Sequence, residues 1–386
     1  MTDGTALDHD LDARLSAIIE NIVRPSAQRI DEAGEYPREA LAALAKNGLL
    51  GLMSPSEAGG GGAPLSAGVE VIERVASACG STAMTLMMHY AASAVIDTHG
   101  SPEQQAQVAT GRGLCTLAFS ETGSRSHFWA PMSTATSDGD RIRLDARKSW
   151  VTSAGEADIY VWSSRPLGNA ATGGMTLWSV PDGIAGLRVD GSFNGLGLCG
   201  NASRPMRAEA VLVPRTAILG EDGDGLNIAL GVILPRFLLL NAAFSLGLME
   251  ALLDQAAAHL THSRLEHLDT NLASQVLPRS AFADLRIQVD STRAFINDTL
   301  SALEGDRDDA ILRVLQVKLV AAEAASAVSD GVMKLCGGTA FRKELGIERQ
   351  FRDSLAARVM APTSEALRDF VGRLSLGRPL FDEEPA

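Results

Sequence analysis

The sequence of 386 residues predicts an α+β protein in three parts: an N-terminal helical domain over 1–113, a central β-barrel or sandwich over 114–222 and a C-terminal helical bundle over 223–386. Two observations predict this order. Apolar residues recur at helical spacing in the first and last parts, whereas short alternating strand patterns separated by turns fill the middle. The chain is also long for one compact core, so several sub-domains are expected.

Helices are expected through the first domain. Pro37 can open a helix that stops at Gly48, because proline fits the first helical turn and glycine fits the position just past the end. Further helices are predicted over 65–78 and 81–99. The glycine run 59–62 predicts a flexible loop, since no Gly-Lys-Ser/Thr follows to make it a phosphate cradle. The apolar residues that mark the first helix are Leu11, Leu15, Ile18, Ile19 and Ile22.

The middle of the chain is predicted to be a set of short strands. Turn residues such as those of 137–140 separate the strand patterns, and this spacing is typical of a small β-barrel or sandwich. The strand patterns lie at 116–119, 141–144, 159–162, 175–180 and 210–213.

The last domain returns to helical patterns. The apolar stretch 226–252 is broken by a proline, an arginine and an asparagine, so a buried helix is favoured over a membrane span. A long helix is expected over 311–335 and should end at the glycine pair 337–338. The final helix is expected to have Thr363 or Ser364 as its N-cap.

Composition and charge narrow the class of protein. The formal net charge of −13 argues against binding to nucleic acid or to an anionic membrane, so a polyanion such as CoA would need a local basic patch. The 4 cysteines show no CxxC or histidine-paired spacing, which predicts structural thiols in a reducing cytosol and no metal site. The first residues lack a basic segment followed by an apolar one, so a cytoplasmic protein is expected.

Three motifs carry the chemistry that the sequence suggests. They are Phe119-Ser120-Glu121-Thr122-Gly123-Ser124-Arg125-Ser126-His127, then Lys148-Ser149-Trp150-Val151-Thr152, then Arg352-Asp353 with the residues that follow to Glu365. In this order they resemble the signatures of the acyl-CoA dehydrogenase family, and the resemblance covers most of the chain. It implies FAD as the cofactor, an acyl thioester of CoA or of an acyl carrier as the substrate, and a homotetramer built as a dimer of dimers.

The first two motifs supply the flavin side of the predicted site. A flavin needs a flat apolar surface, which Trp150 can provide, and hydroxyl or backbone donors near its polar edge. The resemblance assigns the donor roles to Ser120 and Thr152, and places Phe119 and Ser126 beside them. Without the other motifs, the favoured interpretation would be that Trp150 lies in the core of the barrel, with Ser120 and Thr152 on a strand surface.

The resemblance implies further cofactor contacts in the second half of the chain. An arginine of the family reaches the FAD pyrophosphate of the next subunit, a glutamine precedes the glycine pair, and a threonine touches the flavin. The glycine pair lets a backbone approach the cofactor closely. For Glu365, a helix cap is an alternative to a flavin contact. The matching positions are Arg264, Lys334, Gly337, Gly338, Thr363 and Glu365.

The residue that the family uses as its catalytic base is absent. The resemblance puts a glutamate nine residues after Arg352, where this chain has Ala361. A second location used in the family lies immediately before an arginine that matches Arg236, and it holds Pro235. A positioned base accelerates proton removal by roughly 10²–10⁴, so the usual chemistry does not carry over unchanged.

Three functions therefore stay open. The first is FAD-dependent oxidation of a CoA- or carrier-bound acyl thioester without that base, with O₂ involved as in an oxidase or monooxygenase of specialised metabolism. The second is a dehydrogenase with a relocated base, for which His127 is the candidate because histidine titrates near neutral pH; a solvated loop histidine is the alternative. The third is a non-catalytic partner subunit. Candidate substrate contacts are Arg125, Ser126 and Arg236, although Arg125 also fits a solvated surface.

Overall fold

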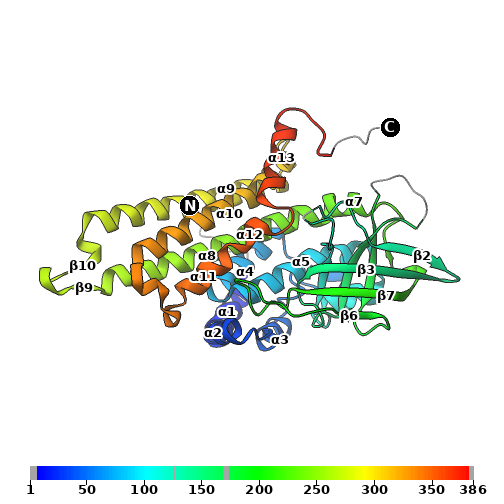
Figure 1. Ribbon diagram of the computed structural model, residues 1–386, viewed down its shortest axis with the longest axis horizontal. Helices are drawn as coiled ribbons and strands as arrows, with labels where there is room; N and C mark the ends of the chain where they lie inside the picture. Colours follow the sequence, from blue (N-terminus) through cyan, green and yellow to red (C-terminus); the bar gives the residue numbers. More distant parts are fainter. Residues whose placement is uncertain (1–6, 126, 168–173, 382–386) are drawn as a thin grey trace. The chain divides into compact units, whose positions relative to one another are not determined.

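The computed structural model of the chain describes residues 7–125, 127–167 and 174–381 (Figure 1). Its order of helices, strands and helices confirms the predicted α+β arrangement. The described chain divides into two compact units. Unit 1 comprises the chain to Ile72 with Ser81–Gly195 and Cys199–Phe237, and unit 2 comprises Glu73–Gly80, Leu196–Leu198 and the chain from Leu238. The domain limits at 113/114 and 222/223 stay a prediction.

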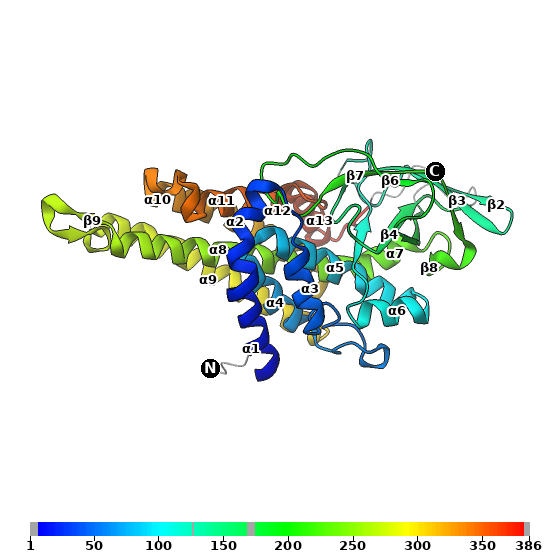
Figure 2. The ribbon, with the colours of Figure 1, turned by 90° about the horizontal axis from the view of Figure 1, so that it is seen from below.

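Helices form the first part of unit 1. One helical rod runs without a break from His9 to Ala33, because a π-helical turn joins its two α-helical parts (Figure 2). The carboxylate of Asp8 caps the rod by accepting a hydrogen bond from the Leu11 N–H at 2.8 Å. The helices are α1 (His9–Ile18), α2 (Arg24–Ala33), α3 (Arg38–Lys46), α4 (Leu65–Ala78, which runs on into unit 2), α5 (Gly80–His99) and α6 (Pro102–Ala109).

Within the described residues, two four-stranded sheets form the middle of unit 1, with strand orders β1-β4-β5-β8 and β2-β3-β7-β6. In the first sheet β1 pairs parallel with β4, and the other neighbours pair antiparallel. In the second sheet β2, β3 and β7 lie side by side (Figure 1). The strands are β1 (Cys115–Ala118), β2 (Thr134–Asp138), β3 (Arg141–Val151), β4 (Ile159–Ser164), β5 (Thr176–Pro181), β6 (Leu187–Val189), β7 (Arg204–Pro214) and β8 (Ile218–Leu219).

Long helices dominate unit 2. The helices α8, α9 and α10 run side by side, and the short strands β9 (Arg264–Leu265) and β10 (Thr270–Asn271) lie at the turn between α8 and α9 (Figures 1 and 2). Thr363 is the N-cap of the last helix, as predicted. The helices are α7 (Gly225–Ile228) at the end of unit 1, α8 (Leu234–His262) leading into unit 2, α9 (Val276–Glu304), α10 (Ala310–Cys336), α11 (Ile347–Ser354), α12 (Ala356–Val359) and α13 (Ser364–Ser375).

One helical stretch among the described residues, Gly225–His262, is long and apolar enough to cross a membrane. Its most apolar window has a mean hydropathy of 1.8, and 72% of that window is buried inside the protein. Burial of this extent is what the core helix of a helical domain requires, in agreement with the buried helix that the sequence favours.

Candidate functional site

A buried ion pair fixes the loop that follows β1. Lys148 Nζ lies 2.5 Å from Glu121 Oε1, and both side chains are almost fully buried. Glu121 Oε2 accepts the backbone N–H groups of Met132 and Ser133 at 2.7 and 2.8 Å, while Lys148 also donates to the Ser163 carbonyl at 2.8 Å. Burial lowers the pKa of Lys148 to about 8, and the charge of Glu121 opposes this shift. Glu121 therefore organises the loop, since its oxygens are occupied by the chain itself.

Trp150 presents an exposed aromatic face. Its side chain is 67% exposed, and its backbone has the left-handed φ of +56°. The pairing of β3 with β7 is irregular between Lys148 and Val151, and such a bulge re-aims a side chain out of the strand alternation. The ring of Phe193 meets the indole edge-on, at 6.2 Å and 87°. Trp150 is therefore not a core residue, and its open indole face fits a flat ring such as a flavin.

The polar residues predicted beside Trp150 come from the same region of unit 1. Ser149 N–H donates to the Ser120 carbonyl at 2.8 Å, and this bond joins the first two motifs. Phe119 and Ser120 are half-buried at the end of β1. Thr152 is buried, with its hydroxyl oxygen 3.2 Å from Ser203 Oγ. The other predicted residue of this group, Ser126, lies outside the described residues.

The loop after the first motif holds the candidate base at the surface. His127 is exposed, with Nδ1 lying 3.0 Å from the Ser124 carbonyl oxygen. Its ring stands edge-on to Trp129 at 4.9 Å and 81°. Arg125, the candidate substrate contact, is also exposed and has a φ of +51°. These contacts tie His127 to its own turn, and its role as a base stays a prediction.

Asp97, which no motif in the sequence marks, lies near enough to Arg236 within unit 1 to feel its charge. Burial raises the pKa of Asp97 to about 6, while a hydrogen bond from Ser54 Oγ at 2.9 Å and the charge of Arg236 oppose the shift. Burial also lowers the pKa of Arg236, which donates to the Val232 carbonyl at 3.2 Å. Among the described residues, the buried Oδ1 of Asp97 has no hydrogen-bond partner. A half-buried carboxyl of this kind beside an arginine is a candidate acid–base group.

In unit 2, the predicted cofactor residues include two exposed cations and a glycine turn. Arg264 and Lys334 each pair with a nearby aspartate, and their side chains are 59% and 75% exposed. Cations this exposed are free to turn toward a phosphate group. Gly337 follows α10 with φ +56° and ψ −139°, a conformation that glycine adopts without strain. Gly338 has no positive φ, and a Cβ at that position would meet nothing within 4 Å.

The Arg352-Asp353 pair of the third motif is structural. Asp353 is buried and accepts the Leu198 N–H at 2.6 Å. Arg352 donates to Glu348 at 2.7 Å and to the Leu196 carbonyl at 3.1 Å. The pair therefore fastens residues 196–198 to α11 within unit 2.

The segment between α12 and α13 carries the position of the missing base. Ala361 is half-buried, Met360 before it is extended, and the peptide bond from Ala361 to Pro362 is cis. Thr363 Oγ1 accepts a backbone N–H of the first turn of α13 at 3.3 Å. Glu365 is exposed in that first turn, where a carboxylate interacts favourably with the helix dipole. This placement fits the helix-cap alternative for Glu365.

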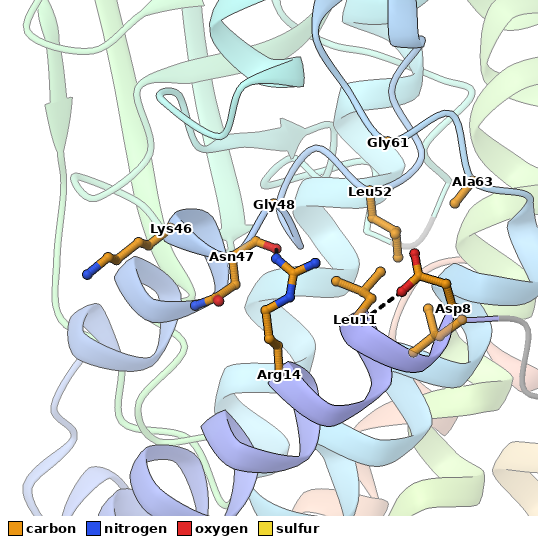
Figure 3. Close-up of a pocket in the computed structure, with 10 residues that line it drawn as sticks. Asp8, Leu11, Arg14, Lys46, Asn47, Gly48, Leu52, Gly61 and Ala63 are labelled. Atoms are coloured by element: carbon orange, nitrogen blue, oxygen red, sulfur yellow. Dashed lines mark hydrogen bonds between the residues drawn. The ribbon is translucent and has the colours of Figure 1, made fainter.

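A separate hollow of about 510 Å³ lies between α1, the end of α3 and the glycine run (Figure 3). Arg14 lines this hollow. Its guanidinium donates a hydrogen bond to the Asn47 carbonyl at 3.3 Å and pairs with the Asp10 carboxylate at 3.0 Å. The predicted site residues do not line it, so the hollow is no part of the candidate site. Within the described chain, no group of three or more histidine, cysteine or acidic side chains could hold a metal ion.

A helical, β and helical arrangement with these motifs in order defines an oxidoreductase of the acyl-CoA dehydrogenase type. Three family profiles match the chain: acyl-CoA dehydrogenase N-terminal domain over 6–111, middle domain over 116–211 and C-terminal domain over 223–376. The chain therefore belongs to the acyl-CoA dehydrogenase family.

Individual relatives agree with this assignment. Short-chain specific acyl-CoA dehydrogenase, mitochondrial, of Homo sapiens is 28% identical over 353 residues, which cover 89% of this chain and 84% of that protein. Butyryl-CoA dehydrogenase from Megasphaera elsdenii has a TM-score of 0.89 at 21% identity, covering 96% of this chain and 99% of that chain. The prolyl acyl carrier protein oxidase AnaB has a TM-score of 0.84 at 18% identity, with coverage of 96% and 99%. At these identities the two structures show the shared fold alone.

Proposed function

We propose that the protein binds FAD and oxidises an acyl thioester, carried by CoA or by an acyl carrier protein, without a glutamate base and with O₂ as co-reactant. The observation that carries this proposal is the combination of a flavin side that is present with a base that is missing. Trp150 holds an open indole face, whereas position 361 holds a methyl group. One protein of the same fold, AnaB, is named as a prolyl acyl carrier protein oxidase, so this fold accommodates a carrier-bound substrate in at least that protein.

Each residue of the predicted site would have a role set by the chemistry of its side chain. Bound flavin would supply two-electron redox chemistry at the ring that stacks on Trp150. Ser120 and Thr152 would hold its polar edge. The exposed cation of Arg264 would reach the FAD pyrophosphate of a neighbouring subunit, as the resemblance implies, and Lys334 is a second exposed cation able to bind phosphate. Ala361 neither accepts nor releases a proton, so the substrate C–H must be acidic already or lose its proton to another group.

The electron balance separates the two O₂ reactions. In an oxidase, two hydrogens leave the acyl group and O₂ is reduced to H₂O₂. In a monooxygenase, one oxygen atom enters the substrate and the other becomes water, and this requires two further electrons from a separate reductase. Measuring H₂O₂, and testing whether an added reductase is needed, therefore assigns the reaction once a substrate is found.

The first experiment is the visible absorbance spectrum of freshly purified protein, followed by chromatographic identification of the released flavin. We expect an oxidised-flavin spectrum with about one FAD per chain. In Trp150→Ala the flavin content should fall, because the stacking surface is lost, whereas the fold should change little since the side chain is exposed. Leu376→Ala is the matched control, because Leu376 is also exposed, at 81%, and lies at the end of α13.

Absence of flavin binding, even after incubation with FAD, would contradict the proposal. A flavin-loaded protein should next be mixed with saturated, conjugated and aromatic acyl-CoAs, with and without O₂. Turnover that needs O₂ supports the proposed reaction. Equal turnover with an artificial electron acceptor under anaerobic conditions would instead identify a dehydrogenase with a relocated base.

A homotetramer is part of the proposal. Apolar side chains on α9 and at the start of α10 are exposed in the single chain, and copies of the chain would cover them. Light scattering during size-exclusion chromatography would give the assembly mass, and a monomer would contradict the oligomer. The exposed residues are Val276, Leu277, Ile287 and Ile311, at 69%, 82%, 63% and 67%.

A further inference from the structure

A buried lysine holds the backbone on both sides of Ala361. Lys318 lies on α10 with only 1% of its surface exposed. Its Nζ donates to the carbonyl oxygens of Met360 and Pro362, each at 2.7 Å. All of these residues belong to unit 2, so the contact is internal to one compact body.

The two contacts of Lys318 lie on either side of position 361. Met360 has the extended backbone angles φ −69° and ψ 136°. The carbonyl oxygens of Met360 and Pro362, one on each side of Ala361, both lie 2.7 Å from Lys318 Nζ. The two acceptors therefore face Lys318 together, and Ala361 lies between two fastened peptide groups. This arrangement fixes the backbone that sets the direction of the Cα–Cβ bond at position 361.

Space filling does not explain a lysine at this position. Burying an amine is unfavourable unless its donors are satisfied, and burial lowers the pKa of Lys318 to about 7. An apolar side chain of similar length would fill the same volume without this penalty. The lysine supplies two hydrogen bonds to the main chain that an apolar side chain cannot make.

We propose that Lys318 is a positioning residue, which holds the 360–362 backbone so that position 361 and the following Thr363 keep a fixed orientation in the site. The hydrogen bonds from Lys318 to the Met360 and Pro362 carbonyls lie entirely within unit 2. Its consequence for the cofactor rests on the proposed function, because Thr363 is one of the predicted flavin contacts. The chain thus has an anchored backbone at the position of the base although the base itself is absent.

Hydrogen–deuterium exchange of Lys318→Met tests the fastening without any ligand. The hydrogen-bonded amides that flank the fastened segment, those of Met360, Ala366 and Leu367, should exchange at least tenfold faster than in the wild type, while α10 keeps its protection. The matched control is Ser329→Ala, also buried on α10, whose Oγ accepts from Ser354 Oγ at 3.0 Å. The control should leave the exchange of these three amides unchanged. Unchanged exchange in Lys318→Met would overturn the proposal.

Acetylation of the native wild-type protein gives a test that does not depend on a variant folding. Lys334, whose side chain is 75% exposed, should react, whereas Lys318 should stay unmodified until the protein is denatured. Acetylation of both lysines at similar rates in the native protein would overturn the buried contact.

FAD binding tests whether Lys318 positions residues that contact the cofactor or only stabilises the local structure. With FAD added, Lys318→Met should bind at least tenfold more weakly than Ser329→Ala, and its visible spectrum should shift. Unchanged FAD affinity and spectrum, despite faster exchange of the Met360, Ala366 and Leu367 amides, would overturn the positioning role. A wild-type protein that binds no FAD would contradict the proposed function, and the exchange experiment would still decide the fastening.

Discussion

The buried pair of Lys148 and Glu121 offers a sharp prediction for Lys148→Met. Methionine keeps the length and the apolar part of the side chain but removes the charge and the donors. The variant leaves the Glu121 carboxylate buried without its cation, and leaves the Ser163 carbonyl and hydroxyl without the donor they share. We therefore expect a large loss of stability in unit 1 and a displaced loop after β1.

The magnitude follows from the burial and from the partners that remain. Removing one partner of a buried ion pair costs about 3–5 kcal/mol. Lys148 Nζ also lies 5.2 Å from the centre of the Trp162 ring, a cation–π contact worth about 1–2 kcal/mol when desolvated. Glu121 keeps its bonds from Met132 and Ser133, and these reduce the penalty. Together these contributions predict a loss of about 3–5 kcal/mol in the free energy of unfolding.

Urea unfolding followed by tryptophan fluorescence measures this change, because Trp162 and Trp178 are buried in unit 1. Arg143→Met on the same strand is the matched control, since the pair of Arg143 with Asp145 is exposed to solvent and its loss should change stability far less. In Lys148→Met/Glu121→Gln the loss should be smaller than the sum of the single variants by about 1–3 kcal/mol. A loss below about 1 kcal/mol in Lys148→Met would refute the reasoning.

Three further predictions concern single positions. Gly337→Ala should cost about 1–3 kcal/mol because of its φ of +56° and ψ of −139°, whereas Gly338→Ala should be nearly neutral; urea midpoints compare them. Asp97 has a folded-state pKa of about 6 against an ordinary 3.8, so its contribution to stability is present below about pH 4 and lost as pH rises through 6. Asp97→Asn should remove that slope and be the more stable protein at neutral pH, and identical pH profiles would contradict this. Ala361→Glu should give dehydrogenation of saturated acyl-CoAs, measured by dye reduction; no turnover in the flavin-loaded variant would mean that the pocket has diverged.

Much of the fold could be predicted because its signals are local. The helical periods predicted α3, α4, α5 and α10 to within one or two residues, and the strand patterns predicted strands in the middle. The first helix continues to Ala33, past its last predicted marker Ile22, and α6 was not predicted. Trp150 shows the limit of this reasoning. Its alternation in β3 fits a core residue as well as a flavin surface, and the choice depends on a bulge and a left-handed φ that the pattern does not contain.

The sequence by itself determined the family resemblance, the order of the elements and the substitution of the base by Ala361, because these depend on residue identity and spacing. The tertiary structure decided which polar groups meet. Glu121 forms an ion pair with Lys148, and Asp97 lies near the charge of Arg236. Lys318 donates hydrogen bonds to the carbonyl oxygens of residues 360 and 362. Periodicity reports which side of a helix or strand is buried, but a buried charge is stabilised by partners from distant segments, and only the folded chain brings those partners within hydrogen-bond distance.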